Sequence, residues 1–158
     1  MSKKITIPNE FRLEFALTGY TTMLKGFMYV IRERHGAAEA LACFKRFFEM
    51  DDRMRNATKF LKTVFKIEGN DVETITDWLV VWYEIFGFEY DVLERSKTIS
   101  RIKITKCPWK TGYKDVSGWC NIWGDLVYTT INPKATHELT KGMCAGDPYC
   151  DFIVKIEE

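Results

Sequence analysis

The segment EYDVLER, residues Glu89–Arg95, is followed by Ser96-Lys97-Thr98 and then by ISRIKIT, residues Ile99–Thr105, and this stretch decides the fold class. In the second segment isoleucines alternate with cationic residues, which is the two-residue period of a half-buried β-strand. A short polar connection between two such segments is typical of a β-hairpin. Upstream of about residue 87 the apolar residues recur at helical spacing instead.

The N-terminal part, residues 1–87, therefore predicts helices. The first covers Glu10–Arg34, and Gly36 suits a left-handed C-terminal cap. A second helical stretch begins at Ala37, breaks near Asp51-Asp52 and ends at Gly69. We expect the buried side of the first helix to consist of its apolar residues, namely Phe11, Phe15, Leu17, Tyr20, Leu24, Phe27, Met28 and Ile31.

A third helix begins after Asn70, which with Glu73 has the spacing of a capping box, and it ends at Gly87. Beyond the hairpin, Cys107-Pro108 should end the second strand, because proline cannot donate to a ladder. Residues Asp115–Asn132 predict a further helix. Two final strands, Ala135–Met143 and Cys150–Ile156, flank a turn over residues 146–149.

The resulting order predicts an α+β fold in which N-terminal helices pack on an antiparallel sheet of two hairpins with an intervening helix. At 158 residues and 46% hydrophobic composition, we expect one domain over residues 1–158. Its helical part is 1–87, and its sheet-plus-helix part, 88–158, carries the cysteine site.

Composition also narrows the function classes. The net charge is +1, which gives no strong field toward nucleic acid or anionic membranes. A basic segment does run from Arg95 to Lys114, but its alternation with isoleucines favours a solvated strand face over a nucleic-acid site. Met1–Pro8 lacks the apolar region of a signal peptide, and the apolar run Trp78–Tyr83 is too short to span a bilayer, so we expect a cytoplasmic protein.

Cysteine usage gives the first functional indication. Of five cysteines, four lie between positions 107 and 150, namely Cys107, Cys120, Cys144 and Cys150. In a reducing compartment such clusters are often metal ligands, and thiolates suit zinc or another thiolate-preferring metal. His137 or Glu138 could add a ligand. Since the chain has no Cys-x-x-Cys pair, the alternative is that these thiols are small buried apolar side chains.

A catalytic interpretation needs a thiolate beside a base. Cys120 with His137 is the candidate pair, and Glu138 or Asp147 could orient the imidazole. The alternative for His137 is a hydrogen-bonded core histidine, because it alternates with Leu139 along its strand.

The tryptophans suggest a pocket for a small molecule, since ligand cavities are lined mainly by apolar and aromatic groups. Trp78 and Trp82 share a helix face that is equally typical of a core. Trp109, Trp119 and Trp123 lie near Cys107 and Cys120 in sequence, and they suit either a flat ligand or a homodimer surface.

Four motifs carry a family resemblance. They are Cys107-Pro108-Trp109, Gly118-Trp119-Cys120, Ile131-Asn132-Pro133 and the segment Gly146-Asp147-Pro148-Tyr149-Cys150-Asp151-Phe152. Over the last third of the chain they resemble the L-2-amino-thiazoline-4-carboxylic acid hydrolase-like family, whose C-terminal part is similar to 4-vinyl reductase domains.

The resemblance implies this α+β fold, an aromatic-lined pocket between helices and sheet, and a structural zinc held by Cys150 with Cys120 as partner. The sensor domains of the 4-vinyl reductase type have a Glu-x-x-Cys sequence just before the final turn. This chain reads His137–Gly142 there, so Cys144 or Cys107 would have to replace the missing cysteine as a zinc ligand. The implied activity is ring-opening hydrolysis of a C=N or amidine-like bond in a small heterocycle, with Lys106, Lys110 or Lys141 binding a substrate carboxylate. The alternative is a non-catalytic small-molecule-binding or sensor domain.

Overall fold

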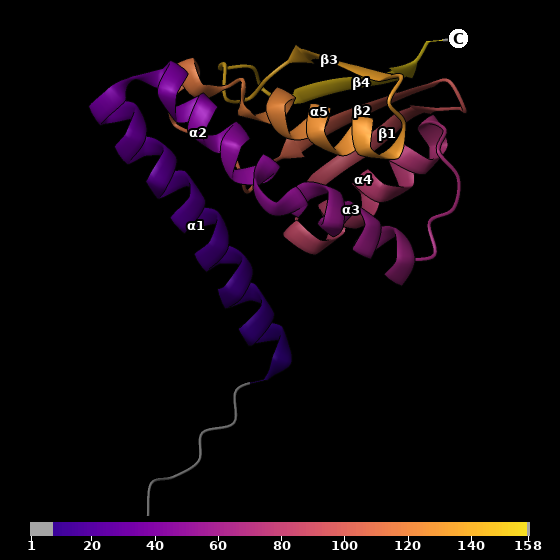
Figure 1. Ribbon diagram of the computed structural model, residues 1–158, viewed down its shortest axis with the longest axis horizontal. Coiled ribbons are helices and arrows are strands. Elements are labelled where there is room, and N and C mark those ends of the chain that lie inside the picture. Colours follow the sequence, from indigo (N-terminus) through magenta and orange to yellow (C-terminus); the bar gives the residue numbers. More distant parts are fainter. Residues whose placement is uncertain (1–7, 158) are drawn as a thin grey trace, which may run out of the picture.

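The computed structural model describes residues 8–157, and most of Met1–Pro8, which we predicted not to be a signal peptide, lies outside that range. The chain has the predicted α+β fold, with N-terminal helices and a four-stranded antiparallel sheet (Figure 1). In chain order the elements are α1 (Asn9–His35), α2 (Ala37–Glu49), the 3-10 turn η1 (Met50–Asp52), α3 (Arg53–Val64), α4 (Val72–Phe86), β1 (Glu89–Arg95), β2 (Ile99–Lys106), the 3-10 turn η2 (Lys114–Val116), α5 (Trp119–Ile131), β3 (Ala135–Lys141) and β4 (Cys150–Ile156).

The joints between the first three helices lie where the sequence predicts them. Gly36 separates α1 from α2 with φ of 90° and ψ of 168°, which is a positive-φ conformation outside the left-handed helical region expected there. Asp51 and Asp52 take left-handed backbone angles, with φ of 55° and 52°, and so produce the kink between α2 and α3. Aspartate is one of the few side chains that tolerates this region.

The predicted cap of α4 is wrong by one residue. Asp71, not Asn70, precedes the helix, and its carboxylate accepts a hydrogen bond from the backbone N–H of Thr74 at 2.9 Å. Asp71 has the extended backbone that an N-cap residue requires, whereas the Asn70 carbonyl accepts from the Asn132 side chain. Gly87 ends α4 in the left-handed conformation, as predicted.

The sheet has the strand order β1-β2-β4-β3, so the two predicted hairpins meet through β2 and β4. Their register pairs Ile102 with Phe152 and Ile104 with Cys150. Cys107-Pro108 follows directly after β2, as expected. Three predicted elements are shorter than expected. The second helical stretch ends with α3 at Val64 rather than at Gly69, because Lys66 takes a positive φ of 54°. α5 begins at Trp119 because η2 occupies 114–116, and β3 ends at Lys141 because the chain turns at Gly142.

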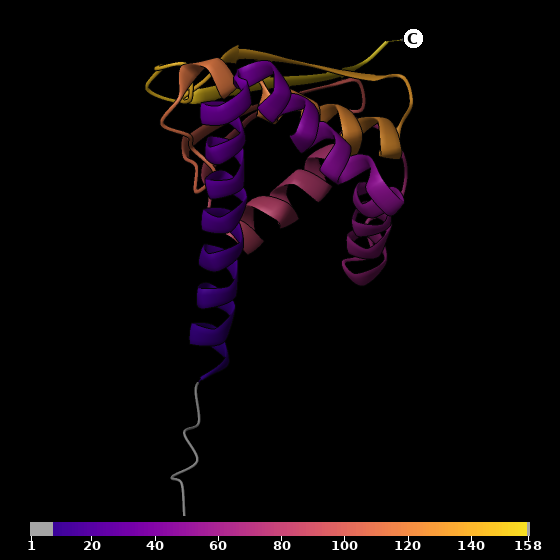
Figure 2. The same cartoon turned by 60° about the vertical axis from the view of Figure 1, so that its left-hand side comes forward.

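All helices lie on one side of the sheet, and the core fills the space between (Figures 1 and 2). Ile75, Trp78 and Leu79 of α4 are completely buried there, together with Ile102 of β2. None of the helices within residues 8–157 has the length and apolar character that crossing a membrane requires.

The expected buried side of α1 is partly wrong. Met28 is buried, but Phe11, Phe15 and Phe27 are 60%, 82% and 63% exposed. Apolar residues occupy more than one side of this helix, while its contacts with the fold begin only at about Tyr20 and continue to Arg32. Its N-terminal end stands clear of the other elements in both views (Figures 1 and 2).

Candidate functional site

An aromatic cavity lies where the helices meet the end of the sheet that carries the cysteines. Its walls come from α2, α4, α5, β2, β4 and the segment after β2, and its volume is about 50 Å³. The lining residues are Phe44, Trp82, Tyr83, Phe88, Ile104, Cys107, Trp109, Trp119, Cys120, Trp123, Cys150 and Phe152. We call this space the tryptophan–cysteine cavity.

Four of the five tryptophans predicted to form a pocket line this cavity. The fifth, Trp78, lies one layer behind and stacks on Trp82, with ring centroids 5.4 Å apart and planes 14° from parallel. The ring centroids of Trp123 and Trp82 are 5.2 Å apart, and those of Trp109 and Trp119 are 5.6 Å apart. The five indoles thus form one continuous group.

The indole N–H groups of this cluster lack acceptors. The Nε1 atoms of Trp78, Trp109, Trp119 and Trp123 are buried and have no hydrogen-bond partner among the residues that the structure describes. A buried donor left without a partner costs about 1–3 kcal/mol, so such atoms are rare in folded proteins. Three of them belong to side chains that line the cavity, whose exposed wall is almost entirely apolar.

Three of the four predicted metal-binding cysteines line the cavity, and all five cysteines of the chain are free thiols. Burial raises the pKa of Cys107 to about 12 and that of Cys120 well above its usual value. Burial also raises the pKa of Cys150. At neutral pH these three side chains are therefore neutral thiols.

Cys144 lies outside the lining, beside the other thiols. Its sulfur accepts a hydrogen bond from the backbone N–H of Thr111 at 3.3 Å, and Cys150 accepts one from Met143 at 3.3 Å. Within residues 8–157, no group of three or more His, Cys, Asp or Glu side chains is arranged to hold a metal ion.

Among the described residues, no hydrogen bond joins the predicted catalytic residues Cys120, His137, Glu138 and Asp147 to one another. His137 faces α5, where its ring packs on Tyr128 and its Nδ1 lies 3.3 Å from Asp125. Burial lowers the pKa of His137, and the Asp125 carboxylate opposes that shift only in part. Glu138 is exposed, and Asp147 accepts a hydrogen bond from the Gly142 N–H within the turn before β4. Cys120 lies in the aromatic wall instead.

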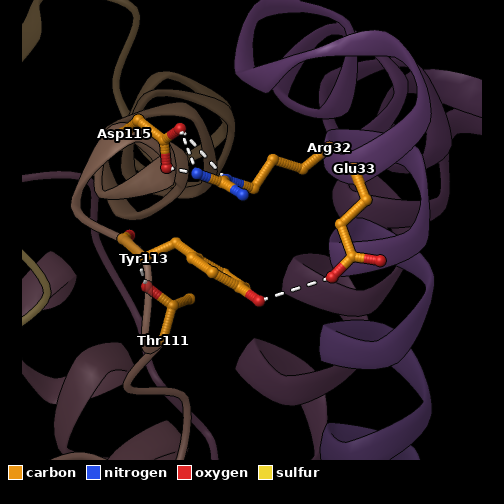
Figure 3. A network of polar contacts seen from close by, with 5 residues as sticks. All are labelled: Arg32, Glu33, Thr111, Tyr113 and Asp115. Carbon is orange, nitrogen blue, oxygen red and sulfur yellow. Dashed lines mark hydrogen bonds and ion pairs between the residues drawn. The ribbon is translucent and has the colours of Figure 1, made fainter.

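The wall segment after β2 is held in place by α1 (Figure 3). Arg32 forms an ion pair with Asp115 at 2.8 Å, and its guanidinium lies 4.1 Å from the centre of the Tyr113 ring. Lys25 donates to the Pro108 carbonyl at 3.1 Å. The position of Cys107 and Trp109 therefore depends on the C-terminal half of α1.

Several lining residues escaped sequence reasoning, namely Phe44, Tyr83, Phe88, Ile104 and Phe152. They come from α2, α4, β2, β4 and the connection between α4 and β1, and each fits an ordinary core pattern. Only Tyr83 carries a local signal for the pocket, because it is adjacent in sequence to Trp82. Recognising the others requires the meeting of α2 with the end of the sheet, which no local pattern encodes.

This arrangement favours binding over proton transfer. The cavity offers aromatic faces and neutral thiols, and three of its lining indoles carry unpartnered N–H groups, whereas a general base within hydrogen-bond reach of a thiol is what nucleophilic catalysis requires. A volume of about 50 Å³ is enough for a small molecule of a few heavy atoms, since about 10–15 Å³ on this measure holds a water.

The sequence model of a family described as Methanogen output domain 1 matches residues 33–155 of the chain. No curated protein matches the chain.

Proposed function

Since the chain belongs to the Methanogen output domain 1 family, we propose that it is a small-molecule-binding domain of a signalling protein, with its ligand in the tryptophan–cysteine cavity. The observation that carries the proposal is the set of unsatisfied indole donors in an apolar wall. The word "output" in the family description supports a role in signalling over a role in turnover.

The donors define what the ligand must offer. Trp109, Trp119 and Trp123 supply N–H groups and have no acceptor among the described residues. A ligand with an acceptor atom, such as a carbonyl or ring oxygen, would satisfy them and remove their desolvation penalty. The remaining wall is aromatic or thiol, so the rest of the molecule should be apolar and flat.

Hydrolysis of a thiazoline-like ring stays a prediction of the family resemblance, and we propose ligand binding in its place. Cys107 and Cys120 are neutral at physiological pH because burial raises their pKa values, and a neutral thiol is a poor nucleophile. His137 contacts Asp125 and Tyr128.

The proposal is tested by side-chain NMR of the indole groups. Only five indole N–H signals exist in this chain, one for each tryptophan. Cyclopentanone and cyclopentane form a matched probe pair that differs by one carbonyl oxygen. We expect the ketone to move at least one of the signals of Trp109, Trp119 and Trp123 downfield and the hydrocarbon to move it less, because only the ketone accepts a hydrogen bond.

The variant Trp119→Phe keeps an aromatic ring and removes one donor, so it should weaken cyclopentanone binding about three- to ten-fold, the worth of one hydrogen bond. Trp78→Phe is the matched control, since its indole lies behind the cavity, and it should leave the affinity unchanged. Equal responses to ketone and hydrocarbon, or indole signals that neither probe moves, would contradict the proposal.

The zinc site also stays a prediction, and metal analysis of the untagged protein tests it. About one zinc per chain, with thiols released by a chelator, would support the assignment of Cys107, Cys120, Cys144 and Cys150 as ligands. Because structural zinc contributes directly to folding free energy, chelation would then lower the melting temperature. Protein free of metal, with five thiols that titrate after unfolding, would contradict it.

A further inference from the structure

One side of α1 carries an exposed row of apolar residues. Its members follow one another at alternating intervals of three and four positions, and we call them the α1 seam: Leu13, Ala16, Tyr20, Met23, Phe27 and Val30. This is the a and d pattern of a coiled coil, in which one helix packs on another. Leu13, Met23, Phe27 and Val30 are 58%, 58%, 63% and 49% exposed, so most of the seam is uncovered in the single chain.

An apolar groove runs beside the seam between α1 and α2. Met23, Phe27, Cys43 and Phe47 are among its lining residues, and its volume is about 340 Å³. The α1 residues that line the groove lie between Tyr20 and Ile31. The N-terminal end of the same helix stands free (Figures 1 and 2). One molecule thus presents both a groove and a free apolar helix end.

We propose that α1 pairs antiparallel with α1 of a second copy of this chain, and that the N-terminal end of each helix lies along the groove of the other copy. In this arrangement the seam pairs with itself. Leu13 faces Val30 of the partner subunit, Ala16 faces the partner's Phe27, and Tyr20 faces the partner's Met23. Each layer then combines residues of complementary size, and a two-fold axis passes between the central layers.

Charge and backbone size select the antiparallel direction. Along the edge of the seam, Arg12 faces Glu33 of the partner subunit, and Gly19 faces the partner's Gly26. Arg12 forms no ion pair among residues 8–157, and Glu33 is contacted only by the Tyr113 hydroxyl at 3.5 Å (Figure 3). Both glycines have open space where a Cβ would lie, so the helices can approach closely. A parallel pair would instead place Arg12 opposite Leu17 of the partner subunit.

The first test is the mass of the protein in solution, measured by light scattering on a sizing column. We expect twice the 18.5 kDa of one chain at micromolar concentration. Phe27→Glu places a charge in the seam at a site that is exposed in the single chain, so it should raise the dimer dissociation constant at least about 100-fold without unfolding the domain. Thr18→Glu, on the opposite side of α1, should leave the dimer intact. A monomeric wild-type protein, or a Phe27→Glu dimer as tight as wild type, would overturn the proposal.

The second test concerns direction. Arg12→Glu and Glu33→Arg should each weaken the dimer about three- to ten-fold, because each places like charges opposite one another at both ends of the pair. The double variant Arg12→Glu/Glu33→Arg should restore the wild-type affinity. A double variant no tighter than either single one, or single variants with wild-type affinity, would overturn the antiparallel pairing.

Discussion

At the scale of single residues, the cysteines of the cavity are side chains of a reactive type that are held in an unreactive protonation state. A thiol reacts as its thiolate, and burial in an apolar wall disfavours that charged form. Cys107, Cys120 and Cys150 all have raised pKa values for this reason, and each of the three also feels the others or Cys144 as a like charge. Their function in the free protein is therefore that of small polarisable wall residues.

We expect at most one thiol of the native protein to react rapidly with Ellman's reagent at pH 8. That thiol is Cys43, which lies on α2 away from the cavity, although partial burial and the Glu39 carboxylate raise its pKa too. The remaining four should react only after unfolding, because Cys107, Cys120 and Cys150 have raised pKa values and Cys144 is buried. The measurement is the number of equivalents released before and after adding guanidinium chloride. Cys43→Ser should remove the rapid phase, and two or more rapid equivalents in that folded variant would contradict the expectation.

At the scale of elements, α5 depends on an unusually close approach to β3. Gly124 lies in the middle of α5, and a Cβ there would meet Tyr128 at 3.0 Å and the His137 ring at 3.1 Å. Both neighbours are rings held in packed positions, so neither can yield as a flexible chain end would. The turn of α5 that precedes this contact carries Cys120 and Trp123, which line the cavity.

Gly124→Ala should therefore destabilise the domain by about 1–3 kcal/mol, although alanine is the better helix former by about 1 kcal/mol. Denaturant unfolding followed by circular dichroism measures the change. In the His137→Ala background the same substitution should cost less, because the ring that meets the new methyl group is gone. Equal costs in the two backgrounds would show that the contact with His137 does not limit the approach.

Elements were also the scale at which sequence reasoning served best. Glycine at the ends of α1 and α4, aspartates at the kink and the alternation in β2 are local signals, and each lies where its element begins, bends or ends. The cap of α4 was misplaced because Asn70 and Asp71 are both good caps, and only the backbone conformation decides between them. The cavity could be predicted only through its tryptophans, because Phe44 and Phe152 join it through long-range packing.

At the scale of the whole molecule, α1 connects two regions that the sequence presents separately. Tyr20 belongs to the α1 seam, and its ring also packs on Trp109 of the cavity wall with centroids 5.9 Å apart. Arg32 and Lys25 hold the same wall segment from the other half of the helix. A movement of the cavity wall would therefore be transmitted through α1 to the seam, and a movement at the seam would be transmitted through α1 to the cavity wall.

If two copies fold as one unit, thermal stability should depend on protein concentration by mass action. We expect the Tm of the wild type to rise by about 2 °C for each tenfold increase in concentration, given the entropy of unfolding of a chain of this size. Phe27→Glu should have a Tm that is independent of concentration. Differential scanning calorimetry over two decades of concentration checks both, and a concentration-independent Tm for the wild type would argue against an obligate pair.

The continuous group of indoles has a consequence for optics. All five tryptophans of the chain belong to it, and neighbouring centroids lie between 5.2 and 6.1 Å apart. At such separations excitation energy passes between rings within their excited-state lifetime, so light absorbed by any indole is emitted from the group as a whole. Sulfur atoms at the same wall are efficient quenchers. The ultraviolet emission of this protein is thus a readout of one place only, and it requires no attached dye.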